Sequence, residues 1–237
     1  MNFPAPPPVS LCEEFVFHAG RPDMTDKQGF LLGLKRSLEQ GALTYEQCAM
    51  EIAHFVHYGE KRRSYDESGW CKEYISHVLE VYNGPQLFSD YYVAEYTEEE
   101  RMLALVHDVV EKRIPGAQKW TLDDFRFLGF NEPFIENLDA ISKRQGEGYA
   151  DYILRGSYFP SVRKVKIYDN LSNSLDSPSD HQELRYMISL PYLIAVDAGA
   201  IPLGTHPEVY AERIGRGDIY KQAMIMPPSG WGEFTKK

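Results

Sequence analysis

A histidine and an aspartate follow one another inside an otherwise apolar stretch of this chain. His107 and Asp108 lie in segment 100–111 (ERMLALVHDVVE), whose Met, Leu and Val side chains would cover nearly every side of a helix. A helix that is apolar all round is normally buried. Burying an ionisable aspartate beside a histidine costs free energy unless both are paired or bind a metal. The pair therefore indicates either a hydrogen-bonded core or a metal site, and Glu111 lies one turn further along.

Three further segments place histidines, carboxylates or basic side chains where packing alone would not require them. They are HYGEKRR (57–63), YISH (74–77) and VKIYDNLSN (165–173). A single histidine on an apolar helix is more often a hydrogen-bonded core residue than a ligand, and His54 fits that description. A basic run such as 61–63 is usually a solvated turn. The four segments together, in this order, favour a shared site.

The order and spacing of these segments resemble those of the HD-domain phosphohydrolases, most closely the RelA/SpoT-type alarmone hydrolase domains and their small stand-alone relatives. The similarity extends from about Glu51 to Asp176. It implies an HD-domain helical bundle and a metal site made of four ligands. These ligands are His77, His107, Asp108 and Asp169. Two imidazoles and two carboxylates suit a Mn²⁺-like ion better than a structural zinc ion.

The resemblance also implies which residues act on the attacking water. Glu111 corresponds to the family's catalytic glutamate, which would orient or deprotonate the water, and Asp108 would serve catalysis as a metal ligand. The alternative for Glu111 is a salt bridge, for example with Arg101. The family usually has an aspartate after this glutamate, whereas this chain has Lys112, which would either weaken hydrolysis or bind an additional phosphate. Tyr168 replaces a small residue beside the last ligand, a bulky change next to the metal.

Substrate contacts follow from the same comparison. Arg62 and Arg63 correspond to a basic pair that contacts the phosphates or the base, and Asn173 to an asparagine four residues after the last ligand. The expected reaction is metal-dependent release of pyrophosphate from a (p)ppGpp-like nucleotide. Two alternatives stay open: another HD nucleotidase or phosphodiesterase, and a catalytically weak nucleotide-binding regulatory module, which Lys112 favours.

Composition limits the partners. The chain has 237 residues, 43% of them hydrophobic, with a formal net charge of −10 and no long basic run. Duplex nucleic acid is therefore not expected as a partner, and the partner that the resemblance implies is a small nucleotide. No apolar run approaches the roughly 18 residues of a membrane helix, and the N-terminus lacks the features of a secretory signal. Three widely spaced cysteines favour reduced thiols and a cytoplasmic location.

The spacing of apolar residues predicts that all the elements that position these residues are helices. About ten helices are expected and no convincing strand, with 59–73 as a polar loop. The expected helices span 26–40, 44–58, 74–83, Thr97 to the His-Asp pair, Thr121 to near Gly129, 132–142, 148–156, 159–176, 180–197 and 207–226. The expected organisation is a flexible segment 1–25, a hydrolase domain 26–176 and a helical extension 177–237. That extension could cover the site, extend the core or form a homo-oligomer interface.

Overall fold

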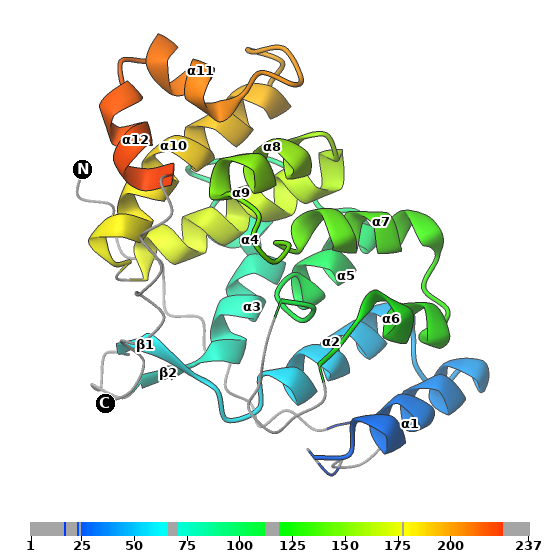
Figure 1. The fold of residues 1–237 in the computed structure, drawn as a ribbon. Helices are drawn as coiled ribbons and strands as arrows, with labels where there is room; N and C mark the ends of the chain where they lie inside the picture. The colour runs from blue at the N-terminus through cyan, green and yellow to red at the C-terminus, as the bar shows by residue number, and fades with distance from the viewer. Residues whose placement is uncertain are drawn as a thin grey trace.

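The chain folds into a mostly helical structure, which confirms the all-α prediction (Figure 1). This computed structural model describes residues 25–65, 71–111, 119–176 and 178–224 together with Phe17 and Asp23, so most of the predicted N-terminal segment 1–25 lies outside it. The helices are α1 (Lys27–Glu39), α2 (Tyr45–Val56), α3 (Tyr74–Tyr82), α4 (Gly84–Leu87), α5 (Glu98–Val106), α6 (Leu122–Leu128), α7 (Glu132–Ile141), α8 (Tyr149–Ser157), α9 (Pro160–Leu175), α10 (Asp180–Asp197), α11 (Pro207–Arg213) and α12 (Gly217–Met224).

Local sequence signals fix where several of these helices begin. Thr44, Thr97 and Ser179 each accept a hydrogen bond from the backbone three residues later, and the side chain at that third position returns a bond to the cap. This reciprocal capping box satisfies two backbone donors that the first turn would otherwise leave open. The starts of α2, α5 and α10 therefore agree with the sequence to within a residue.

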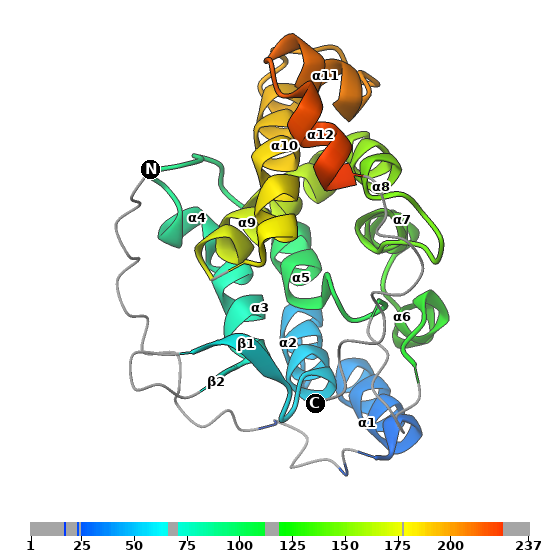
Figure 2. The same ribbon diagram turned by 60° about the vertical axis from the view of Figure 1, so that its left-hand side comes forward.

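Helices α3, α5 and α9 pack against one another at the centre of the molecule. Helix α2 covers α5, and α7 lies against both α5 and α9. On the other side α10 packs along α9, and Figure 2 shows α12 lying alongside α10, with α11 next to both. The three central helices are the ones that carry the histidine and aspartate segments of the sequence, so the core itself brings those segments together.

Within the segment expected as a polar loop, 59–73, two stretches form antiparallel strands instead, and this strand pair is called the hairpin below. Strand β1 (Lys61–Tyr65) pairs with β2 (Cys71–Glu73), with Lys61 opposite Glu73. Charged residues occupy most of both strands, so the alternation of apolar and polar residues that marks a half-buried strand is missing. The prediction of a loop was wrong because these strands lack that alternation. Arg62 lies in β1, so the hairpin holds it in a defined position.

The His-Asp pair lies at the end of a helix rather than within one. Helix α5 ends at Val106, His107 is its C-cap, and the amide of Val109 donates back to the carbonyl of Val106 in a tighter turn. The apolar pattern continues through Val110, which is why the sequence suggested a longer helix. A similar interruption occurs near Gly215 (φ 72°), where the expected helix 207–226 divides into α11 and α12.

Helix α10 contains a proline in its interior. Pro191 has no amide hydrogen, so the carbonyl of Met187, four residues earlier, loses its normal helical partner. Arg216, between α11 and α12, supplies one instead, because its Nη1 donates to that carbonyl at 2.6 Å. The C-terminal helices are thereby tied to the middle of α10.

Candidate metal centre and adjoining cleft

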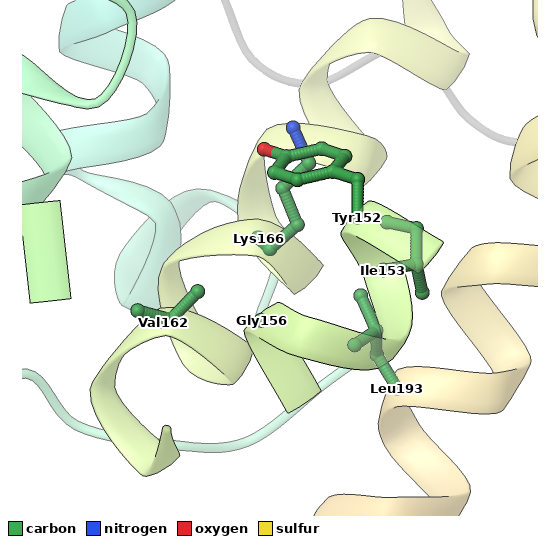
Figure 3. A pocket seen from close by; sticks show the side chains of 6 residues that line it. All are labelled: Tyr152, Ile153, Gly156, Val162, Lys166 and Leu193. Carbon is green, nitrogen blue, oxygen red and sulfur yellow. The ribbon is translucent and has the colours of Figure 1, made fainter. Parts of the chain in front are cut away.

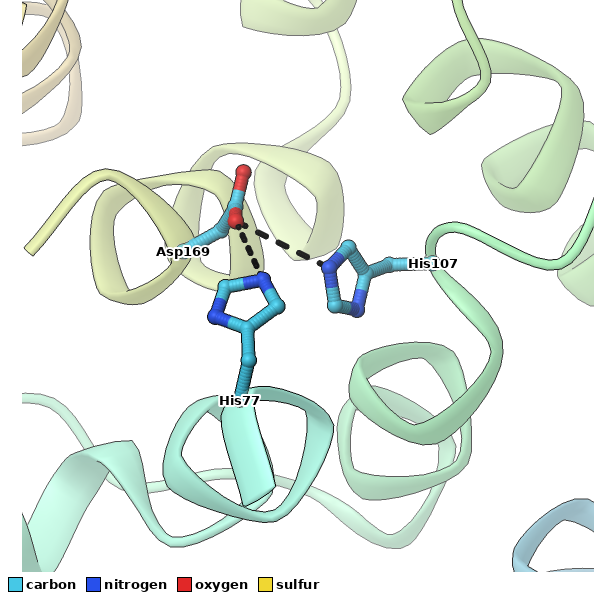
Figure 4. Close-up of side chains that lie close together, drawn as sticks. All are labelled: His77, His107 and Asp169. Atoms are coloured by element: carbon cyan, nitrogen blue, oxygen red, sulfur yellow. Dashed lines mark ion pairs between the residues drawn. The ribbon is translucent and has the colours of Figure 1, made fainter. Parts of the chain in front are cut away.

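Three side chains from the three central helices converge on one point (Figure 4). His77 comes from α3, His107 from the end of α5 and Asp169 from α9, and each is buried. Oδ1 of Asp169 lies 3.1 Å from Nε2 of His77 and 3.7 Å from Nε2 of His107. Within the described residues these three offer ligand atoms that all lie within 4.8 Å of one another, so the group could hold a metal ion.

Hydrogen bonds on the far side of each ring determine which nitrogen faces the centre. Nδ1 of His107 donates to the carbonyl of Ala104 at 2.7 Å. Nδ1 of His77 lies 2.9 Å from Oγ of Ser172, whose hydroxyl donates to Glu80 at 2.7 Å, so the hydroxyl accepts from the ring. In its neutral form, each ring therefore carries its proton on Nδ1 and directs the lone pair of Nε2 inward. This is the arrangement by which proteins orient histidine ligands to metals.

The inward-facing nitrogens have no hydrogen bond of normal geometry in the described part of the chain. When both rings are neutral, two Nε2 lone pairs point at the same carboxylate oxygen, and a proton on one nitrogen or a metal ion between them removes this repulsion. Burial would lower the pKa of His107, but the charges of Asp108 and Asp169 outweigh burial and raise the pKa to about 9. The two carboxylates thus favour positive charge on His107, whereas burial lowers the pKa of His77. A divalent ion would satisfy both nitrogens and the carboxylate together.

Asp108, the fourth expected ligand, lies beside this group and is less buried. Its Oδ2 is 3.4 Å from Nε2 of His107, and it accepts a hydrogen bond from the hydroxyl of Tyr74. The Tyr74 ring in turn stacks on His57, with centroids 4.7 Å apart. Asp108 is not one of the three whose ligand atoms all lie within 4.8 Å of one another, and in this arrangement its carboxylate is shared with Tyr74.

The second carboxylate oxygen of Asp169 binds Lys166, a residue that the sequence did not predict as part of the site. Nζ of Lys166 donates to Oδ2 of Asp169 at 2.6 Å and lies 5.1 Å from the centroid of the Tyr152 ring. Figure 3 shows the lysine extending alongside that ring, next to a cavity of about 10 Å³ that has room for at most one water. Burial would raise the pKa of Asp169, but Lys166 and both histidines outweigh it and lower the pKa.

Glu111, the expected catalytic base, follows Asp108 by three residues, beyond the end of α5. Its Oε1 accepts a hydrogen bond from the backbone amide of Lys143 at 2.5 Å, and its charge interacts with Asp108 and Lys166. Glu111 as a whole is exposed, but burial of its carboxyl group and the charge of Asp108 raise its pKa. A raised pKa makes this carboxylate a stronger base, as a group that accepts a proton from water must be.

Arg62 and Asn173 link the centre to the hairpin. Nδ2 of Asn173 donates to Oδ1 of Asp169 at 2.6 Å, and Nη2 of Arg62 donates to Oδ1 of Asn173 at 2.9 Å. Arg62 also forms an ion pair with Asp176 and lies over the Tyr74 ring at 5.7 Å. Among the described residues its buried Nη1 has no hydrogen-bond partner. The side chain of Arg63 and all of Lys112 lie outside the described residues.

An open cleft of about 400 Å³ adjoins Arg62, a size within the usual range for small-molecule sites. The hairpin, the start of α3, the end of α9 and the start of α10 form its walls. Its lining combines charged, amide, hydroxyl and aromatic side chains: Glu60, Lys61, Arg62, Tyr74, Asn173, Asp176, Pro178, Ser179, Gln182 and Tyr186. The first part of the C-terminal extension therefore forms one wall of the cleft.

Tyr168 does not crowd the metal centre, although it precedes Asp169. Its ring is fully buried and contacts Gly84, where an added Cβ would lie 2.5 Å from its Cγ. Its hydroxyl donates to the carbonyl of Ala94 at 2.8 Å. Successive helical side chains point in different directions, so the bulky residue faces α4 while its neighbour faces the centre.

Neither a protein-family model nor a curated protein matches this sequence. In the part of the chain that the structure describes, every helix is too short or too polar to cross a membrane. The chemical assignment therefore depends on the geometry of the centre and the cleft.

Proposed function

We propose that this protein is a metal-dependent phosphohydrolase that acts on a nucleotide, with a (p)ppGpp-like 3′-pyrophosphorylated guanosine as the first substrate to test. The observation that carries the proposal is the orientation of His77 and His107. Nδ1 of each ring is hydrogen-bonded on the side away from the centre, and both Nε2 atoms lie next to the carboxylate of the buried Asp169. Nitrogen and carboxylate ligands suit several divalent ions, and we expect Mn²⁺. When bound, the ion would polarise a phosphoryl oxygen and lower the pKa of a bound water.

The chain's own residues would perform the other steps. Glu111 accepts a proton from the attacking water, and the amide of Lys143 holds its carboxylate. Arg62 lines the cleft and contributes a positive charge for an anionic substrate. Tyr186, on the α10 side of the cleft, offers a surface on which a base can pack. Asn173 positions Arg62 relative to the centre, because it bonds to both Arg62 and Asp169.

The experiment separates metal binding from turnover. Purified protein is loaded with Mn²⁺ and incubated with ppGpp, pppGpp, dNTPs, nucleoside monophosphates and cyclic dinucleotides, and the products are resolved as pyrophosphate, phosphate or opened rings. Asp169→Asn is expected to lose the metal and all turnover, whereas Glu111→Gln keeps the metal and loses turnover. Glu98→Gln, the same charge change in the exposed first turn of α5, is the control.

Two results would contradict the proposal. Unchanged Mn²⁺ affinity in Asp169→Asn would exclude this centre as the metal site. Bound metal without turnover of any nucleotide in the panel would favour the regulatory binding module, for which Lys112→Asp is the variant expected to raise activity.

A further inference from the structure

The carboxylate of Glu111 is held by a loop from a different part of the chain. In the described residues, its hydrogen bond comes from the backbone amide of Lys143, in the loop that joins α7 to α8 (residues 142–148). Glu111 is exposed and Lys143 lies 32 positions further along the chain, so the orientation of the Glu111 carboxylate depends on where that loop lies. A backbone amide can orient a base only if the loop that carries it is itself fixed.

One arginine fixes the loop. Arg155, from α8, donates from Nη1 to the carbonyls of Asp139 and Ala140, at 2.9 and 3.0 Å, and from Nη2 to the carbonyl of Ser142 at 2.9 Å. Its Nε and Nη2 also bind both oxygens of Glu147, at 2.7 and 2.8 Å. All five N–H groups of the guanidinium are therefore used.

These bonds grip the loop at both ends. The three carbonyls belong to the last turn of α7 and the residue after it, where helical carbonyls lack partners along the chain. Glu147, at the other end, also accepts from the amide of Arg144 at 2.9 Å. The Arg155 and Glu147 side chains are 18% and 13% exposed. A nearby pair, Arg144 with Asp139, is 57% and 40% exposed, and such exposed pairs contribute little.

We infer that Arg155 is a positioning residue, which holds loop 142–148 so that the amide of Lys143 orients the carboxylate of Glu111. The inference rests on the proposed function, because Glu111 acts as a base only in a hydrolase. Lysine cannot replace this arginine, since an ammonium has three donors and cannot form a planar bidentate pair while also binding three carbonyls.

The first measurement does not require activity. In the full chain labelled with ¹⁵N-lysine, the Lys143 amide resonance is assigned by its disappearance in Lys143→Arg. Glu111→Gln should move this resonance, because the charged acceptor is lost. Arg155→Met should move it in the same direction. Arg126→Met, which removes an exposed arginine paired with Asp123 and Glu132, should leave it in place. If Arg155→Met unfolds the chain, Glu147→Gln weakens the same grip while Arg155 keeps its carbonyl contacts.

The second measurement uses the metal-loaded full chain and whichever nucleotide of the panel it hydrolyses. Arg155→Met and Arg155→Lys should each lower kcat at least about tenfold, as expected for a misplaced general base, with KM and the Mn²⁺ dissociation constant changed less than about twofold. A Lys143 resonance that stays in place in a folded Arg155→Met variant overturns the inference, as does an unchanged kcat. If wild type hydrolyses no nucleotide, the proposed function fails, and the amide resonance alone decides the inference.

Discussion

Replacing Ser172 with alanine tests whether the orientation of His77 controls metal binding. The Ser172 hydroxyl connects Nδ1 of His77 to Glu80. Without it, the ring loses the partner that keeps its proton on Nδ1. Loss of such a partner typically weakens metal affinity by about 10–100-fold. At a Mn²⁺ concentration about 100 times the wild-type dissociation constant, binding stabilises wild type by about 2.7 kcal/mol but the variant by only about 0.4–1.4 kcal/mol.

The metal-induced rise in Tm should therefore be about 3–9 °C smaller in Ser172→Ala than in wild type. Thermal unfolding is followed with excess Mn²⁺ and again with EDTA, so that any metal-independent effect of the substitution is subtracted. Ser174→Ala is the matched control, because Oγ of Ser174 donates to the carbonyl of Asn170 at 2.6 Å within the same helix. A metal-induced rise in Ser172→Ala as large as in this control would refute the argument from ring orientation.

Three further predictions concern stability and reactivity. Gly84→Ala should lower the free energy of unfolding by about 1–3 kcal/mol, because the added Cβ would overlap the Tyr168 ring. Gly33→Ala is the control, since a Cβ there meets open space and should not destabilise the fold. Urea unfolding measures the stability of both variants. Burial raises the pKa of the Cys48 thiol to about 12, so in a variant with serine at the other two cysteines it should react with a thiol reagent only on unfolding; rapid native labelling would contradict this. Burial and the charge of His57 lower the pKa of His54 to about 4, so as pH falls from about 6.5 to 4 the unfolded state takes up the proton first and stability is lost. His54→Asn should make the loss over that window smaller by about 1–2 kcal/mol, allowing for solvent screening, and an identical pH profile would count against the assignment.

The sequence carries strong information about the centre of the molecule. His77, His107 and Asp169 were recognisable because polar side chains in apolar helices cost free energy unless they are paired, and the structure brings these three together. Ser172 could have been found with them, since it lies three residues after Asp169 and so faces the same side of α9. Lys166 has the same spacing on the other side of that aspartate.

Other features depend on contacts that no local pattern encodes. Arg155 looks like an ordinary helix-surface arginine, and its role follows only from where α7 ends relative to α8. The end of α5 at Val106 was missed because Val109 and Val110 continue the apolar spacing, while the side chain of His107 takes up a backbone carbonyl. The hairpin was missed because a charged two-stranded ribbon has no apolar face to reveal its period.

The proline in α10 has a consequence for how the molecule opens. If α11 and α12 detach, Arg216 leaves the carbonyl of Met187, and Pro191 ensures that no helical amide can replace it. Detachment therefore leaves the carbonyl of Met187 without a hydrogen-bond partner, one residue after Tyr186, which lines the cleft. Local opening of the C-terminal helices and loosening of the cleft should be parts of one cooperative event, with hydrogen exchange in α10 and α12 sharing the same opening free energy.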